Sequence, residues 1–180
     1  YAPRGLGRRT EWLKQPSRDG DVRGEIEIPA SATQVLLHVR DYTKGHPRIE
    51  ANNPPTRRGA VVGVHNGIIV NDEEIFARYG FERHEPEMTV DSEAIFALVD
   101  AYGPTPEVLG ELRGSMATAW FDEREPDTVY IARGVGRPLW LGEGLSEAFF
   151  ASTKKALEVV EQYLGMTLRK RELPEGILVP

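Results

Sequence analysis

Three short stretches of this chain carry side chains that could hold a free amino acid and stabilise a negatively charged oxygen. Arg40 ends an apolar run and offers a planar set of donors that suits a carboxylate. The pair Asn66-Gly67 offers a side-chain amide and a backbone N–H that a substrate can approach closely. Asp91 stands at the start of a helical pattern and offers a fixed negative charge for an ammonium group. Together these residue types predict a site for an amino acid.

Each stretch also has a purely structural interpretation. Arg40 could pair with an acidic residue at the surface. Asn66-Gly67 is a frequent hairpin turn, and His65 before it suits a core or turn position as well as a ligand position. Asp91 suits the N-cap of a helix. The sequence contains no HExxH motif, glycine-rich phosphate loop or GxSxG motif, so these chemistries have no support.

The composition is that of an ordinary globular protein. The 180 residues are 40% hydrophobic and 28% charged, which predicts a single domain over residues 1–180 with a sizeable core. The net charge of −6 argues against nucleic acid as a partner, because phosphate binding needs a basic face. No apolar run is long enough to span a membrane. The absence of cysteine excludes disulfides and a cysteine nucleophile within these residues, and it is compatible with the cytoplasmic location that we expect.

Hydrophobic periodicity divides the chain into strands and helices. Helices are predicted at residues 72–79, 91–102, 104–112 and 153–164. Strands are predicted at residues 10–14, 24–28, 34–40, 60–64, 68–70, 115–122, 128–133, 138–142, 148–152, 166–173 and 176–179. Residues 34–40 are expected to be a buried strand, residues 41–59 a long functional loop, and residues 65–67 a turn. The order of elements predicts an α+β fold in which two mainly antiparallel sheets are stacked between helix layers.

The order and spacing of the three stretches resemble one known family. Residues 61–75 (VVGVHNGIIVNDEEI) resemble the strand–HNG–strand–Asn–helix signature of the class II glutamine amidotransferase domain, which stands at the front of glutamine–fructose-6-phosphate amidotransferase. Residues 38–47 (HVRDYTKGHP) are similar to that family's H-x-R-x-x-T-x-G-x-P loop. Residues 90–99 (VDSEAIFALV) are similar to the start of one of its helices, where the motif is D-[ST]-E-x-I. The resemblance extends over residues 34–179.

The resemblance implies a four-layer αββα sandwich of the N-terminal nucleophile hydrolase type and a substrate, glutamine. Arg40 would bind the α-carboxylate of glutamine, and Asp91 would bind its α-ammonium group. Thr43 and Gly45 would belong to the loop that closes over glutamine and excludes water. Lys44 stands where the family often has histidine.

The resemblance also implies the chemistry. Asn66 and Gly67 would form the oxyanion hole for the tetrahedral intermediate, and His65 would position that hole rather than act as a general base. The reaction would release glutamate and ammonia, and a partner protein or domain would accept the ammonia. No cofactor and no metal is implied.

The family's nucleophile is an N-terminal cysteine, whereas this chain begins with Tyr1 and contains no cysteine. We expect the nucleophile strand to be missing from this chain. If a cysteine precedes Tyr1, the domain is a glutaminase that supplies an acceptor on another chain. The alternative is a non-catalytic pseudoenzyme that binds glutamine or serves in a larger assembly. A third interpretation, hydrolysis of another amide by an upstream serine or threonine, is disfavoured because Arg40 and Asp91 suit a free amino acid.

Overall fold

The computed structural model describes residues 32–39 and 43–180. The helices are α1 (Asp72–Tyr79), α2 (Glu93–Tyr102), α3 (Pro106–Leu109) and α4 (Lys154–Leu164), with a short 3-10 helix, η1 (Glu50–Asn52). The strands are β1 (Thr56–Arg58), β2 (Val61–Ile69), β3 (Gly114–Asp122), β4 (Val129–Arg133), β5 (Trp140–Glu143), β6 (Ala148–Ala151), β7 (Arg169–Glu172) and β8 (Ile177–Val179). None of the helices in this part of the chain has the length and apolar character needed to cross a membrane.

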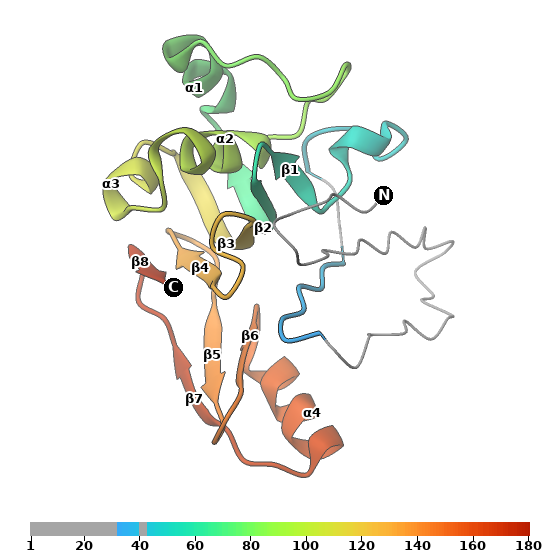
Figure 1. The fold of residues 1–180 in the computed structure, drawn as a ribbon, viewed down its shortest axis with the longest axis vertical. Coiled ribbons are helices and arrows are strands. Elements are labelled where there is room, and N and C mark those ends of the chain that lie inside the picture. The colour runs from blue at the N-terminus through green and yellow to red at the C-terminus, as the bar shows by residue number, and fades with distance from the viewer. Residues whose placement is uncertain (1–31, 40–42) are drawn as a thin grey trace.

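The strands form two antiparallel sheets. One has five strands in the order β1-β2-β3-β4-β8, and the other has three in the order β6-β5-β7. Helix α2 packs on the outer face of the large sheet with α1 and α3 beside it, and α4 packs on the small sheet (Figure 1). The predicted α+β class and the αββα arrangement of two mainly antiparallel sheets are confirmed.

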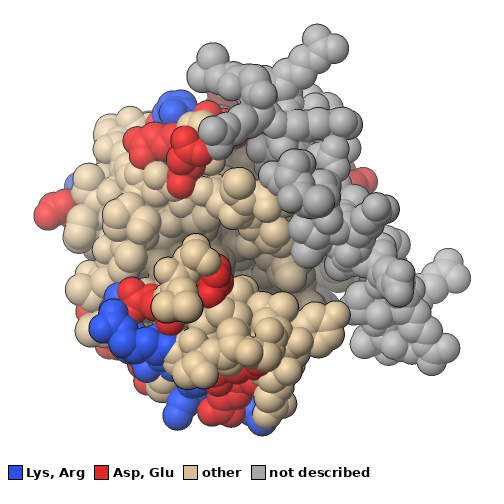
Figure 2. Space-filling view, turned by 60° about the horizontal axis from the view of Figure 1, so that its bottom comes forward, with Lys and Arg blue, Asp and Glu red and all other residues tan. Residues whose placement is uncertain are grey.

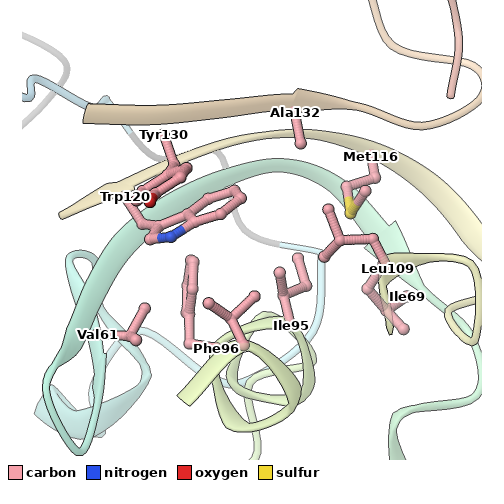
Figure 3. Packing of buried hydrophobic residues seen from close by; sticks show 10 residues of the cluster. Val61, Ile69, Ile95, Phe96, Leu109, Met116, Trp120, Tyr130 and Ala132 are labelled. Carbon is pink, nitrogen blue, oxygen red and sulfur yellow. The ribbon is translucent and has the colours of Figure 1, made fainter. Parts of the chain in front are cut away.

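Strand β3 shows how the sequence builds these layers, because its successive side chains point to opposite faces of the sheet. Met116 and Trp120 point toward α2, where Trp120 is fully buried against Phe96 (Figure 3). The ring of Trp120 also stacks on Tyr130 of β4, with the ring centroids 5.4 Å apart. Large rings of this kind contribute much of the burial energy of a core, and an offset stack adds to it.

The other face of β3 meets the second sheet. Ala117 and Ala119 are buried there, and they let the second sheet approach closely. The buried residues of this inter-sheet core are Ala117, Ala119, Ile131, Leu139, Leu141 and Leu173. The alternation of β3 therefore separates a helix-facing core from an inter-sheet core.

Most predicted elements are confirmed, with shifted ends. The helix predicted at residues 104–112 is shorter. It begins after Thr105, whose side chain accepts a hydrogen bond from the N–H of Val108, and it ends at Leu109, before the C-cap residue Gly110. The strands predicted at residues 10–14 and 24–28 lie outside the described residues. Within residues 43–59 the structure contains η1 and β1, which a loop prediction missed because the polar strand TRR has no apolar alternation.

The buried strand predicted at residues 34–40 is wrong for residues 34–39, which adopt no regular structure. Leu37 and Val39 expose 66% and 84% of their surface. An apolar run is held as a strand only when a neighbouring strand satisfies its backbone, and no strand of the described chain pairs with these residues.

The turn predicted at residues 65–67 is also wrong. Strand β2 runs without interruption from Val61 to Ile69 and pairs with β3 along its whole length. Asn66-Gly67 is typical of a hairpin when the two flanking strands pair with each other. Here the partner strand comes from residues more than forty positions later, so the dipeptide lies inside a strand.

Charges are mixed on the surface. On the face in Figure 2, acidic and basic side chains of the described residues lie close together, and uncharged surface separates the groups. This face therefore presents no continuous basic area.

Candidate functional site

A pocket of about 590 Å³ lies where β2, β3, the end of β6 and the loop after residue 43 meet. Five of the residues singled out in the sequence line it, namely Thr43, His65, Asn66, Gly67 and Asp91. Gly45 lies close to the pocket-lining Asn52 but is not itself part of the lining. Arg40 lies outside the described residues, so its proposed contact remains a prediction.

The backbone N–H of Gly67 points away from β3. Gly67 stands opposite Met116, and Met116 directs its own N–H to Val135 and its carbonyl to Gly134 on the far side. In an antiparallel ladder, two opposite residues of this kind do not hydrogen-bond to each other, and both direct their backbone groups outward. On the outward side of β2, β1 pairs only as far as Gly63. No strand of the described chain therefore takes the N–H of Gly67.

Only glycine fits this position. Gly67 has a φ of 148°, and a β-carbon there would lie 2.0 Å from the carbonyl oxygen of Ser115 and 2.7 Å from Nε2 of His65. The close approach holds the pocket wall against β3 and leaves the backbone accessible from the pocket.

Side chains alternate along β2, so the side chain of Asn66 points away from α2, toward the space between the two sheets. It is half-buried, lines the pocket, and makes no hydrogen bond to any described residue. An amide that is held on a strand without a protein partner can donate to a bound ligand. Asn66 and Gly67 therefore present two donors to one pocket.

Asp91 is a buried carboxylate that is fixed to β2. It exposes 2% of its surface, and its Oδ2 accepts a hydrogen bond from the N–H of Ile69 at 2.6 Å. The carboxylate thus accepts the hydrogen bond that a neighbouring strand would otherwise accept at the unpaired edge of β2. Within the described residues its nearest cationic candidate is His65, whose Nδ1 lies 4.0 Å away. A buried carboxylate with no strong cation beside it favours a cationic ligand.

The interpretation of Asp91 as an N-cap is wrong. Helix α2 begins at Glu93, and Ser92 occupies the N-cap position without a side-chain capping bond. Asp91 precedes the cap, and its side chain turns back to the sheet.

His65 connects the pocket wall to the start of α2. Its Nε2 lies 3.1 Å from the carbonyl oxygen of Ser115, so this nitrogen carries the proton. Its Nδ1 lies 3.0 Å from Oγ of Ser92 and must accept the hydroxyl proton. Burial lowers the pKa of His65, although the charge of Asp91 acts in the opposite direction. The ring is neutral at pH 7 and holds Ser92 and Ser115 in place, which suits a positioning role.

Asn52 attaches the loop after residue 43 to the segment that leads into Asp91. It is fully buried, and its Oδ1 accepts from the N–H groups of Thr89 at 2.7 Å and Val90 at 3.0 Å. Gly45, with a φ of 81°, packs directly on Asn52, and a β-carbon there would lie 2.9 Å from its Cγ. Packing on Asn52 therefore requires glycine at position 45, independently of the role in the substrate loop that the resemblance implies.

Lys44 enters a buried network of charges. Its Nζ lies 2.7 Å from Oδ1 of Asp72 at the start of α1, and Asp72 also binds Arg83. Arg83 in turn contacts Glu93, which is completely buried and also pairs with Arg58. The network attaches the loop to the first two helices, because each buried carboxylate needs its cations.

Asn52 and Arg137 are among the pocket residues that sequence reasoning missed. Asn52 lies two residues before a pair of prolines, and this composition is typical of any loop. Arg137 stands before Pro138 in the turn between β4 and β5, where a surface cation is equally common. Neither residue has a local signal, because the groups that each approaches lie far away in the sequence.

Comparison with known proteins agrees with this architecture. The family model of the glutamine amidotransferase domain matches residues 43–159. Glutamine–fructose-6-phosphate aminotransferase (isomerizing) of Shigella flexneri is 35% identical over 158 residues, which covers 83% of this chain and 25% of that protein. The enzyme of the same name from Methanothermobacter thermautotrophicus is 32% identical over 176 residues, covering 92% of this chain and 29% of its own length. The chain thus spans about a quarter of the length of these relatives.

A solved structure supports the fold. Glutamine phosphoribosylpyrophosphate amidotransferase from B. subtilis superimposes with a TM-score of 0.54 at 22% identity, covering 78% of this chain and 31% of that chain. Since the family model matches well over half of the chain and relatives above 30% identity cover most of it, this chain belongs to the class II, N-terminal nucleophile type of glutamine amidotransferase domains.

Proposed function

We propose that the pocket binds L-glutamine as a free amino acid. The observation that carries this proposal is the buried carboxylate of Asp91, which is hydrogen-bonded to the same strand edge that presents the N–H of Gly67. The carboxylate would receive the α-ammonium group, and the side-chain amide would extend toward Asn66 and Gly67. Thr43 would contact the ligand from the loop, and Arg40 keeps its predicted role at the α-carboxylate.

We further propose that the domain releases ammonia from glutamine when a cysteine from outside these 180 residues completes the site. The thiolate would attack the amide carbon, and the resulting oxyanion would accept hydrogen bonds from the N–H of Gly67 and the amide of Asn66. The proton that the thiol loses would pass to the amide nitrogen, so that collapse of the tetrahedral intermediate would expel ammonia and leave a thioester. Water would then hydrolyse the thioester to glutamate and free the thiol.

The ammonia would pass to an acceptor outside this domain. The relatives' names pair glutamine with fructose-6-phosphate or with phosphoribosylpyrophosphate, and this chain matches about a quarter to a third of their length. A partner domain or protein that carries the acceptor site would therefore complete the reaction.

A second candidate function is a non-catalytic module that binds glutamine or serves in an assembly. It rests on one observation, the absence of cysteine from all 180 residues. The site described above would then recognise the amino acid without cleaving it.

The deciding experiment determines the intact mass and amino-terminal sequence of the protein from its natural source and measures ammonia release from L-glutamine. Calorimetric titration of the same sample with L-glutamine and D-glutamine measures binding. A terminal cysteine with ammonia release supports the enzyme. Stereoselective binding without release supports the second candidate. No binding at millimolar L-glutamine contradicts the proposed substrate.

A further inference from the structure

Arg137 is a pocket-lining cation whose charge the described protein leaves unpaired. It follows β4, and its Nε is shielded from solvent without any hydrogen-bond partner. Among the described residues we find no carboxylate within ion-pair distance of its guanidinium group. The Nε of the neighbouring Arg133 is also buried without a partner, but the guanidinium group of Arg133 donates to the carbonyl of Leu173 and its charge is paired with Glu172 at 2.7 Å.

A buried donor without a hydrogen-bond partner lowers the stability of the fold, and a bound ligand that accepts this hydrogen bond would remove the cost. The guanidinium group is always charged and offers several donors in one plane, which suits a carboxylate. The other cation that lines the pocket, Lys44, is already bound to Asp72. Arg137 is thus the described pocket cation that remains available for an anionic ligand.

Arg137 lies at the end of the pocket formed by Asn66 and Gly67. The residue before it, Gly136, packs against Ser115, where a β-carbon would lie 3.2 Å from the serine Cβ. The carbonyl of Ser115 is the group that His65 binds, next to Gly67. Burial and, to a smaller extent, the positive charge of Arg137 lower the pKa of His65, which agrees with a position of Arg137 near this end of the pocket.

We propose that Arg137 binds the negative charge that appears at the amide end of glutamine, so that the pocket holds glutamate more tightly than glutamine. The inference rests on the proposed function, because it assumes that the amide end lies beside Asn66 and Gly67. Before the reaction this end is a neutral amide, and after hydrolysis it is a carboxylate. With the carboxylate, the guanidinium group of Arg137 can form an ion pair with two parallel hydrogen bonds, whereas the neutral amide offers one acceptor oxygen and no negative charge, so Arg137 distinguishes the two ligands.

Arg137 could instead bind the α-carboxylate, and the two arrangements predict different results. At the α-carboxylate, loss of Arg137 weakens glutamine and glutamate equally, because both ligands carry that group. At the amide end, loss of Arg137 weakens glutamate alone.

The experiment is calorimetric titration of the 180-residue chain with L-glutamine and L-glutamate. Because the chain has no cysteine, no cysteine thiolate is present to consume glutamine during the titration. We expect glutamate to bind about tenfold more tightly, and Arg137→Gln to remove this preference while changing glutamine affinity by less than about twofold. Arg169→Gln is the control, because it removes the same charge from an exposed side chain away from the pocket.

Thermal unfolding checks that each variant is folded. Arg137→Lys is a second variant that keeps the charge but loses the planar group, and we expect it to retain part of the preference for glutamate. Equal losses for both ligands, or no change in either, overturn the inference while leaving the proposed substrate intact. Failure of the unaltered chain to bind either ligand refutes the proposed function itself, and the inference falls with it.

Discussion

The carboxylate of Asp91 is hydrogen-bonded to the backbone N–H of Ile69, two residues along β2 from Gly67. Two residues of a strand span about 6.6 Å, which is comparable to the distance between the amino group and the amide of an extended glutamine. Because both groups belong to one strand edge, the backbone of β2 would set the distance between the ammonium group and the oxyanion in the proposed binding mode. Loop movement would therefore leave this distance unchanged.

The charge of Asp91 is the first feature to test. Asp91→Asn keeps an acceptor for Ile69 but removes the charge, so L-glutamine affinity should fall by about tenfold or more. Glutaramate, which is glutamine without its ammonium group, should bind the unaltered chain weakly and should lose nothing further in the variant. Titration of both ligands against both proteins checks this. Equal affinities of glutamine and glutaramate for the unaltered chain would contradict the role given to Asp91.

A methyl group at Gly67 should disrupt the pocket wall. Gly67→Ala places a carbon 2.0 Å from the carbonyl of Ser115 in a backbone conformation that alanine avoids, so we expect a loss of about 3 kcal/mol or more in unfolding free energy. Urea denaturation measures it. Gly80→Ala is the control, because Gly80 also has a positive φ of 66° but has nothing within 4 Å of the added carbon. Its cost should be about 1 kcal/mol, and equal costs for the two variants would exclude the steric explanation.

The buried amide of Asn52 should matter for both stability and binding. Asn52→Ala leaves the N–H groups of Thr89 and Val90 without their acceptor, at a cost of about 1–3 kcal/mol each. Because these residues precede Asp91, glutamine affinity should fall as well. Asn53→Ala is the matched control, since Asn53 donates to the carbonyl of Pro47 at an exposed position and its loss should cost under about 1 kcal/mol. Urea denaturation and titration with L-glutamine should show larger losses of stability and affinity for Asn52→Ala than for Asn53→Ala.

Acid should weaken the fold through His65. Its folded pKa is lowered by burial, so below about pH 6.5 the unfolded chain binds a proton that the folded chain resists. The contribution of His65 is therefore complete above pH 6.5 and is lost as the pH falls, by at most about 1.4 kcal/mol per pH unit. Urea denaturation of the unaltered chain and of His65→Gln between pH 7.5 and 5.5 measures the difference. A stability difference that does not vary with pH would show that His65 does not titrate in this range.

Local sequence patterns predicted those helices and strands whose hydrophobic periodicity is clear within the element itself. Helices α1 and α4 and strand β3 carry clear periodicity, and their predicted positions are confirmed. The run at residues 34–39 has the composition of a strand, but a strand also needs a partner, and composition does not contain one. Asn66-Gly67 has the composition of a turn, yet the paired strand β3 keeps it extended.

The site divides in the same way. The chain could be matched to a family because Asn66, Gly67 and Asp91 keep a recognisable order and spacing. Asn52 and Arg137 could not be found from the sequence. Asn52 matters because it binds residues at least 37 positions further along the chain, and Arg137 matters because its Nε lacks a partner. Such relationships exist only once the chain is folded.

The pocket is the unfilled end of the inter-sheet core. Ala117 and Ala119 belong to that core and also line the pocket, so the same two methyl groups contact the protein interior on one side and form the pocket wall on the other. A ligand here would complete the packing of the protein, and occupancy would raise the melting temperature by mass action. A substitution that enlarges either alanine would occupy the ligand's space and alter the core at once.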